Sequence, residues 1–193
     1  MSRRAQRSYA ERRAEKAAVD DPAVVLEAAA RFLEARARSV GEVRRRLTSA
    51  GYRADLIEGA IDRMTELGML DDATFARAWI ESRDRARPRG ERALSEELRV
   101  RGVDRSVIVA ALDERRTTAS DDGDDTTPSA DEAAAERLLA RHARALDRIA
   151  DPRARRQRAY ALLARNGFDP SVCGSASAAL MSGAHLDDPV TPE

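Results

Sequence analysis

The sequence has few of the residues from which catalytic and metal sites are built. Among 193 residues there are one cysteine, Cys173, and two histidines, His142 and His185. A single cysteine excludes an intramolecular disulfide and a multi-cysteine metal site. A lone imidazole on a predicted helix lacks the further groups that a metal site or a catalytic triad needs. We therefore expect Cys173 in the core, His142 packed or half-exposed on a helix, and no catalytic residue, metal or cofactor. The chain is not expected to be an enzyme.

Aromatic residues are also scarce, at 4 %, and the net charge is zero. No segment alternates apolar and polar residues as a strand would, and Ala, Leu, Arg and Glu dominate, so the fold is predicted to be all-α. No apolar run is long enough to cross a bilayer, which leads us to expect a cytoplasmic protein without membrane contact. The zero net charge gives no global argument for nucleic-acid binding.

Three glycines recur in the same local pattern. Gly51, Gly102 and Gly167 each follow a leucine by four residues and precede an apolar residue. This order is typical of a helix that ends at a left-handed C′ glycine, after which the next residue packs back. Three copies predict an elongated, curved array of three tandem three-helix repeats, and such arrays typically bind long or repetitive partners.

The spacing of the glycines locates a linker. The first two are 51 residues apart and the last two 65, so the third repeat is displaced by 14 residues. Residues 117–130 (TTASDDGDDTTPSA) have that length, four aspartates and no large apolar residue, which predicts a flexible acidic linker that leaves the third repeat tethered. The predicted organisation is a basic disordered arm (1–20), repeat 1 (21–70), repeat 2 (71–116), the linker (117–130), repeat 3 (131–182) and a disordered tail (183–193).

Capping residues mark the predicted helix starts. Aspartate followed by proline, a serine with glutamate three residues later, and isolated aspartates supply the N-caps. These are Asp21-Pro22, Ser39 with Glu42, Asp71 or Asp72, Asp104, Ser129 with Glu132, Asp151-Pro152 and Asp169-Pro170. Arg53 stands where the other repeats have Asp104 and Asp169, so this helix start should lack a cap. Trp79 is predicted to be a core residue.

Arginine is the remaining candidate for function, and it is enriched around the middle helix of each repeat. Two interpretations stay open. The clusters are either a binding face for phosphates or an acidic protein groove, or a solvated surface with i,i+4 ion pairs. The candidate residues are Arg44, Arg45, Arg46, Arg85, Arg87, Arg89, Arg92, Arg99, Arg101, Arg153, Arg155 and Arg156.

Two segments resemble the bacterial RecX family. They are residues 67–77 (LGMLDDATFAR) and residues 89–103 (RGERALSEELRVRGV), and residues 38–52 fit the family's first repeat. The resemblance covers about residues 24–115 well and the third repeat more loosely. The chain departs from the family pattern at Arg89-Gly90-Glu91, where a glycine-proline pair is expected, and in its acidic linker.

The resemblance implies a regulator that lies in the groove of the RecA–single-stranded DNA filament. Members of this family contact neighbouring recombinase subunits and usually suppress filament growth, ATP hydrolysis, strand exchange and the co-protease response. The expected partners are therefore the RecA filament and its single-stranded DNA, in recombination, repair and the SOS response, with the chain itself a monomer. The alternative is a helical-repeat protein that binds nucleic acid directly through its arginines, independently of RecA.

Overall fold

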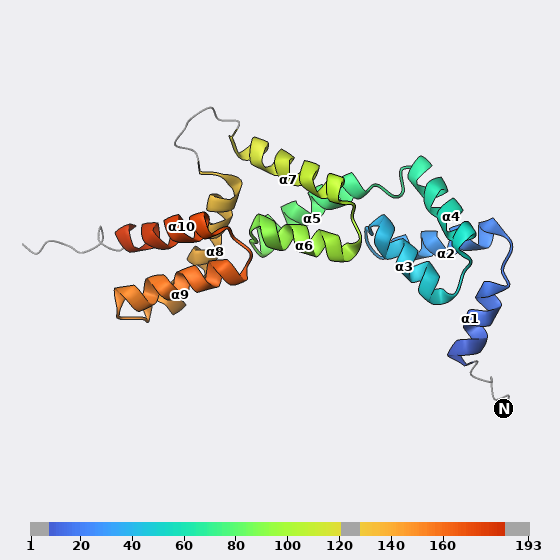
Figure 1. The fold of residues 1–193 in the computed structure, drawn as a ribbon, viewed down its shortest axis with the longest axis horizontal. Helices are drawn as coiled ribbons and strands as arrows, with labels where there is room; N and C mark the ends of the chain where they lie inside the picture. Colours follow the sequence, from blue (N-terminus) through green and yellow to red (C-terminus); the bar gives the residue numbers. More distant parts are fainter. Residues whose placement is uncertain (1–7, 121–127, 184–193) are drawn as a thin grey trace, which may run out of the picture. The chain divides into compact units, whose positions relative to one another are not determined.

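The computed structural model describes residues 8–120 and 128–183, which form ten α-helices (Figure 1). The chain divides into two compact units. Unit 1 contains the residues up to Ala76 together with Arg99–Val107, and unit 2 contains Arg77–Leu98 together with the residues from Ile108. Helices α5, α6 and α7 contribute residues to both units. The predicted all-α fold of tandem three-helix repeats is confirmed.

Unit 1 is built on repeat 1. Its complete helices are α1 (Tyr9–Ala17), α2 (Pro22–Leu33), α3 (Val40–Ala50) and α4 (Ala54–Glu66). Apolar residues at helical spacing on α2, α3 and α4 form one buried core that includes Val25, Val43, Leu47, Ile57 and Met64. Leu70, which follows α4, closes this core and is 2 % exposed.

Unit 2 joins most of repeat 2 to repeat 3. Repeat 2 consists of α5 (Asp72–Ala86), α6 (Glu91–Arg101) and α7 (Arg105–Ser120), and repeat 3 of α8 (Ala130–Asp147), α9 (Pro152–Arg165) and α10 (Pro170–Gly183). The core of repeat 3 gathers apolar residues from all three of its helices. Cys173 is fully buried there, as predicted, and burial raises the pKa of its thiol.

The structure contains the local backbone conformations and hydrogen bonds on which the predicted helix boundaries were based. Gly51, Gly102 and Gly167 have φ angles of +104°, +81° and +82°, so all three C′ glycines adopt the left-handed conformation. The serine hydroxyls of both predicted capping boxes accept from the N3 amides of α3 and α8. Arg53 makes no side-chain capping bond at the start of α4, which confirms that repeat 1 lacks the cap that the other repeats have.

The N-terminal arm was predicted to be disordered over residues 1–20, and this is wrong for residues 9–17. Ser8 and Glu11 form a capping box that starts α1, a local signal that outweighs the arginine-rich composition of the segment. The helix then packs on the end of α3, where the Tyr9 hydroxyl donates to the Ser49 carbonyl oxygen at 3.1 Å. Residues 1–7 lie outside the described part of the chain.

The predicted linker is shorter than expected. Helix α7 continues to Ser120, and α8 begins at Ala130 with its N-cap at Ser129. Residues 121–127, the centre of the predicted linker, and residues 184–193 of the predicted tail lie outside the described residues. Repeats 2 and 3 also contact each other directly within unit 2, a feature that the prediction of a tethered third repeat did not include.

Each C′ glycine is covered by a helix from outside its own repeat, which is α1 for Gly51, α3 for Gly102 and α6 for Gly167. A Cβ on Gly51 would lie 2.8 Å from the carbonyl oxygen of Arg13 in α1. On Gly102 it would lie 3.0 Å from the Cα of Gly41 in α3, and on Gly167 it would overlap Ala93 in α6. Glycine is therefore required at these positions for two reasons. It adopts the left-handed backbone conformation, and its lack of a side chain allows a neighbouring helix to approach closely.

Candidate partner-binding surface

The arginines of α3 differ in how free they are to bind a partner. Arg44 donates two hydrogen bonds of 2.7 Å to the carboxylate of Glu58 on α4, and this bidentate pair lowers the pKa of Glu58. Arg45 donates to the carbonyl oxygen of Arg101 at 3.0 Å. The guanidinium carbon of Arg46 lies 5.8 Å from the centre of the Phe32 ring. All three side chains are exposed, but Arg44 is already matched by a carboxylate.

The arginines around the α5–α6 turn fall into two groups. Arg85 pairs with Glu81 one turn earlier, and Arg89 donates to the Asn166 side-chain oxygen at 2.6 Å. Arg87 and Arg92 are exposed, and neither side chain makes a hydrogen bond or ion pair with any residue in the described ranges. Arg92 lies near enough to Asp169 to contribute to the lowered pKa of that carboxyl, but neither arginine of this second group is held by a hydrogen bond or a salt bridge.

At the end of α6 and in α9 the predicted set divides again. Arg101 is half-buried, and its carbonyl oxygen accepts from the buried hydroxyl of Ser39 at 2.7 Å, while Arg99 is exposed. Arg155 donates twice to the Ile149 carbonyl oxygen and so closes the end of α8. Arg153 and Arg156 are exposed, and their side chains bond to none of the residues that the structure describes.

The twelve predicted arginines thus differ in how far the fold already uses them. Several of them are parts of the fold, and the exposed ones that make no side-chain hydrogen bond or salt bridge to the described residues are Arg87, Arg92, Arg153 and Arg156. Sequence reasoning missed Arg141 on α8, which donates to the carbonyl oxygens of Arg85 and Ala86 at the end of α5. No local pattern marks this residue, because its partners are 55 and 56 residues away.

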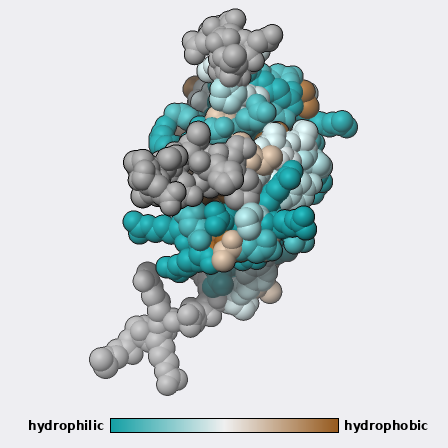
Figure 2. All heavy atoms as spheres, turned by 90° about the vertical axis from the view of Figure 1, so that its left-hand side faces the viewer, coloured by the Kyte–Doolittle hydropathy of each residue, from teal (hydrophilic) through white to brown (hydrophobic). Residues whose placement is uncertain are grey.

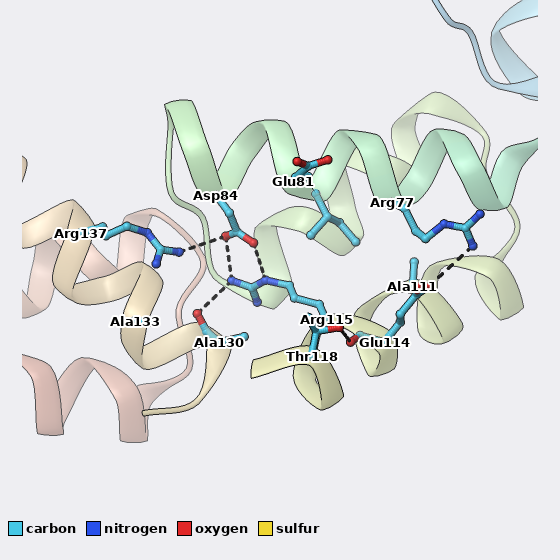
Figure 3. A pocket seen from close by; sticks show the side chains of 11 residues that line it. Arg77, Glu81, Asp84, Ala111, Glu114, Arg115, Thr118, Ala130, Ala133 and Arg137 are labelled. Atoms are coloured by element: carbon cyan, nitrogen blue, oxygen red, sulfur yellow. Dashed lines mark hydrogen bonds and ion pairs between the residues drawn. The ribbon is translucent and has the colours of Figure 1, made fainter. Parts of the chain in front are cut away.

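A second residue that sequence reasoning missed is Arg115 on α7, which is 6 % exposed (Figure 3). It donates two hydrogen bonds, of 2.9 and 3.0 Å, to the Asp84 carboxylate and one of 2.6 Å to Asp131. Burial disfavours its charge, but these bonds outweigh that effect, so the pKa of Arg115 is raised. Burial is the larger effect on Asp131 and raises its pKa, against the opposing effect of the hydrogen bond from Arg115. The trio ties α5 and α7 to α8.

Trp79 is not the core residue that was predicted. It is half-buried, and its indole N–H donates to the Glu97 carboxylate at 2.9 Å. The Arg83 guanidinium lies 4.2 Å from the ring centre and donates to the same carboxylate at 2.6 Å. The helical spacing correctly placed Trp79 beside the buried Ile80, but the polar end of the indole required a partner that sequence spacing does not show.

The junction segment 67–77 has a structural explanation. Asp71 caps α5 by accepting from the amides of Ala73 and Thr74, as predicted. Asp72 accepts from the Val40 amide at 2.8 Å and so caps α3 from a different helix; burial raises the pKa of this carboxyl. Leu67 and Met69, on either side of Gly68, are about half exposed, at 52 % and 50 %. The motif therefore docks α5 on α3 and also presents two apolar side chains to solvent.

Within the described ranges, no three acidic, histidine or cysteine side chains are grouped so that they could hold a metal ion. His142 is exposed on α8. None of the described helices is both long enough and apolar enough to traverse a bilayer.

The face seen in Figure 2, from the side on which α8 to α10 lie in Figure 1, is mostly hydrophilic, with only scattered apolar residues.

Comparison with known proteins gives a consistent assignment. Residues 26–64 match the family model described as RecX, first three-helix domain, and residues 71–112 match RecX, second three-helix domain. The chain is 34 % identical over 142 residues to a regulatory protein RecX of Mycobacterium ulcerans, an alignment that covers 74 % of this chain and 76 % of that protein.

Another relative, the regulatory protein RecX of Mycolicibacterium smegmatis, is 45 % identical over 82 residues, and the aligned part spans only 44 % of its length. The crystal structure of RecX from Lactobacillus salivarius superposes with a TM-score of 0.69 at 18 % identity, covering 83 % of this chain and 97 % of that one. That similarity shows the fold alone, while the sequence matches to the mycobacterial proteins also show the family. The chain belongs to the RecX family of regulatory proteins.

Proposed function

We propose that this protein binds the RecA–single-stranded DNA filament and inhibits recombinase activity in recombination, repair and the SOS response. Family membership supports a regulatory role, and the observation that carries the proposal is the set of uncommitted arginines in two of the three repeats. Arg87 and Arg92 flank the start of α6, and Arg153 and Arg156 lie in the first turns of α9. We also propose that the protein acts by binding its partner and not by catalysing a reaction.

A repeat architecture supports this mode of action physically. A filament presents the same subunit surface many times, and modules on one chain can each make a weak contact whose effects combine through effective concentration. Because the exposed arginines bond to none of the described residues, their guanidinium groups are available for carboxylates or phosphates of a partner. The predicted monomer remains a prediction that sedimentation can test.

The test is the rate of ATP hydrolysis by RecA on single-stranded DNA, with this protein added below the RecA concentration. We expect slower hydrolysis, and a weaker effect from the double variant Arg153→Ala with Arg156→Ala. The matched control is Arg31→Ala with Arg63→Ala, which removes two exposed arginines of α2 and α4 that have local ion pairs. No change in hydrolysis or in filament length with the wild-type protein would overturn the proposal.

Direct binding of nucleic acid without RecA is the second candidate function. The observation that favours it is a pocket of unit 2 that is lined by Arg87, Arg89, Arg141 and His142 and by no carboxylate. It predicts binding to bare DNA with a steep dependence on salt.

A further inference from the structure

Two of the pockets in unit 2 differ in charge. The larger, of about 470 Å³, lies among α5, α7 and α8 (Figure 3). Its three arginines, Arg77, Arg115 and Arg137, are matched by three carboxylates, and Arg115 makes four hydrogen bonds to Asp84, Asp131 and Ala130. Because its charges balance, this pocket has no electrostatic preference for an ion of either sign.

The smaller pocket, of about 220 Å³, is positive. It lies where the α5–α6 turn meets α8 and the end of α9, and we call it the arginine pocket. Its charged and titratable lining residues are Arg87, Arg89, Arg141 and His142, and no carboxylate lines it. The acidic group that faces these residues is Glu97, whose carboxylate lies 3.6 Å from the Nε atom of Arg89. Arg87 and Arg141 have no such acidic partner among the described residues.

Arg141 is held in place without being neutralised. Its guanidinium donates to the carbonyl oxygens of Arg85 and Ala86, the second of these bonds pointing to the last residue of α5. These bonds use two of its five N–H groups, so three remain for another acceptor. The contact orders the cation at a helix C-terminus, where positive charge is favoured. Arg87 and His142 are exposed and face the same pocket.

We propose that the arginine pocket binds a phosphate group of single-stranded nucleic acid. In this chain one carboxylate is already satisfied by one guanidinium, as the bidentate Arg44–Glu58 pair demonstrates. Two uncompensated guanidinium groups and an imidazole around one hollow offer more donors and more charge than a carboxylate can accept. A phosphate group has the additional acceptor oxygens. This proposal rests on the proposed function, in which the pocket contacts the single-stranded DNA of the filament. Binding of DNA by the pocket does not itself require RecA.

The test measures binding of a fluorescent oligothymidylate to the full chain by anisotropy, without RecA. The informative variants are Arg87→Ala and His142→Ala, because neither side chain bonds to a described residue and the fold should not depend on them. The matched control is Arg144→Ala, on the same helix as Arg141, exposed and outside the pocket. We expect Arg87→Ala to weaken binding about fivefold and to reduce the salt slope by about 0.7. The control should change affinity by less than about twofold.

A competition experiment identifies the chemistry. Pyrophosphate should displace the oligonucleotide more effectively than sodium chloride of equal ionic strength, and polyglutamate should not. Equal losses of DNA affinity in Arg87→Ala and Arg144→Ala would mean that the general positive charge of the surface attracts the DNA. That result would overturn the proposed site. Displacement by polyglutamate at the same concentration as by pyrophosphate would overturn the choice of phosphate. Pyrophosphate that binds while the oligonucleotide does not would point to a small soluble phosphate and would also contradict the proposal.

The failure of this proposal is distinguishable from failure of the proposed function. If Arg87→Ala loses DNA binding while wild-type protein leaves RecA hydrolysis unchanged, only the regulatory role is wrong. If RecA is inhibited equally by the wild type and by Arg87→Ala, and bare DNA binding is the same for both, only the phosphate site is wrong.

Discussion

The two places where repeats meet, one within each unit, use the same backbone contact but different polar groups. In unit 1 the start of α3 lies against the end of α6, where a Cβ on Gly41 would be 2.7 Å from the Arg101 carbonyl oxygen and the Gly102 Cα. In unit 2 the start of α6 lies against the end of α9, where a Cβ on Gly90 would overlap Gly167 and Phe168. We call these places the first and second junctions.

The polar side chains of the two junctions differ in what they bond to, which is backbone groups at the first junction and carboxylates as well as backbone groups at the second. At the first junction a buried serine hydroxyl and a half-buried aspartate satisfy backbone groups of the neighbouring helix. The second junction has the Arg115 trio, the Arg141 bonds to α5 and the Arg89–Asn166 bond. Repeats 1 and 2 are connected by a short turn, whereas α7 and α8 are separated by nine residues, 121–129. A longer connection gives a lower effective concentration, so more direct bonding is needed to hold the repeats together.

The largest expected effect comes from removing the charge at the centre of the second junction. Arg115→Ala leaves Asp84 and Asp131 partly buried without their partner, and we expect a loss of about 3–5 kcal/mol in the free energy of unfolding. At the first junction Arg45→Ala removes one exposed bond to the Arg101 carbonyl oxygen and should cost less than about 1 kcal/mol. Urea unfolding of both variants measures the difference. Equal losses would mean that the junctions do not differ in their dependence on charge.

The next effect tests the shared backbone contact. Gly90→Ala places a methyl group against the Gly167 carbonyl oxygen and the Phe168 backbone, and because backbone cannot yield easily we expect a cost of about 1–3 kcal/mol. The control in the same unit is Gly174→Ala in α10, where a Cβ has open space. It should stabilise the protein by about 0.5–1 kcal/mol. If thermal unfolding shows both variants to be more stable than wild type, the close approach at the second junction is wrong.

The smallest expected effect distinguishes the stability contributed by a helix cap from that contributed by a hydrogen bond across the first junction. Ser39→Ala and Ser129→Ala each remove the serine of a capping box, at a cost of about 1 kcal/mol. Ser39 is fully buried and also donates to the Arg101 carbonyl oxygen, so its loss should cost about 1–2 kcal/mol more. Urea unfolding midpoints of the two variants provide the measurement. Equal midpoints would show that the Ser39 bond to α6 contributes nothing beyond capping.

Sequence reasoning succeeded where the determining interaction is local. The C′ glycines and the capping boxes act within three to five residues, so they can be found by spacing alone. The helix α1 was missed although Ser8 and Glu11 carry the same capping signal, because the arginine-rich composition was given more weight than the cap. The family motif also predicted the correct repeats, since its residues make the α4–α5 turn and dock it on α3.

The parts that could not be predicted depend on partners distant in sequence. Arg115 bonds to residues 31 and 16 positions away, and Arg155 differs from Arg153 and Arg156 only because it reaches the Ile149 carbonyl oxygen. Composition shows that arginine is abundant, but it does not show which arginines the fold has already used. The sequence therefore could not separate the arginines that bond within the fold from the others, and Arg141, which lines the arginine pocket, was not among the residues proposed.

Helix α1 occupies the position on Gly51 that a helix of another repeat occupies on Gly102 and on Gly167. Arg13 covers Gly51 in the way that Gly41 covers Gly102 and Ala93 covers Gly167. Lys16 also places its ammonium 5.1 Å from the ring centre of Tyr52, the residue after the glycine. With Arg13 lying on it, the C′ glycine of repeat 1 is closed to the kind of helix that docks on Gly102 and Gly167, so a further module finds no free glycine at this end of repeat 1.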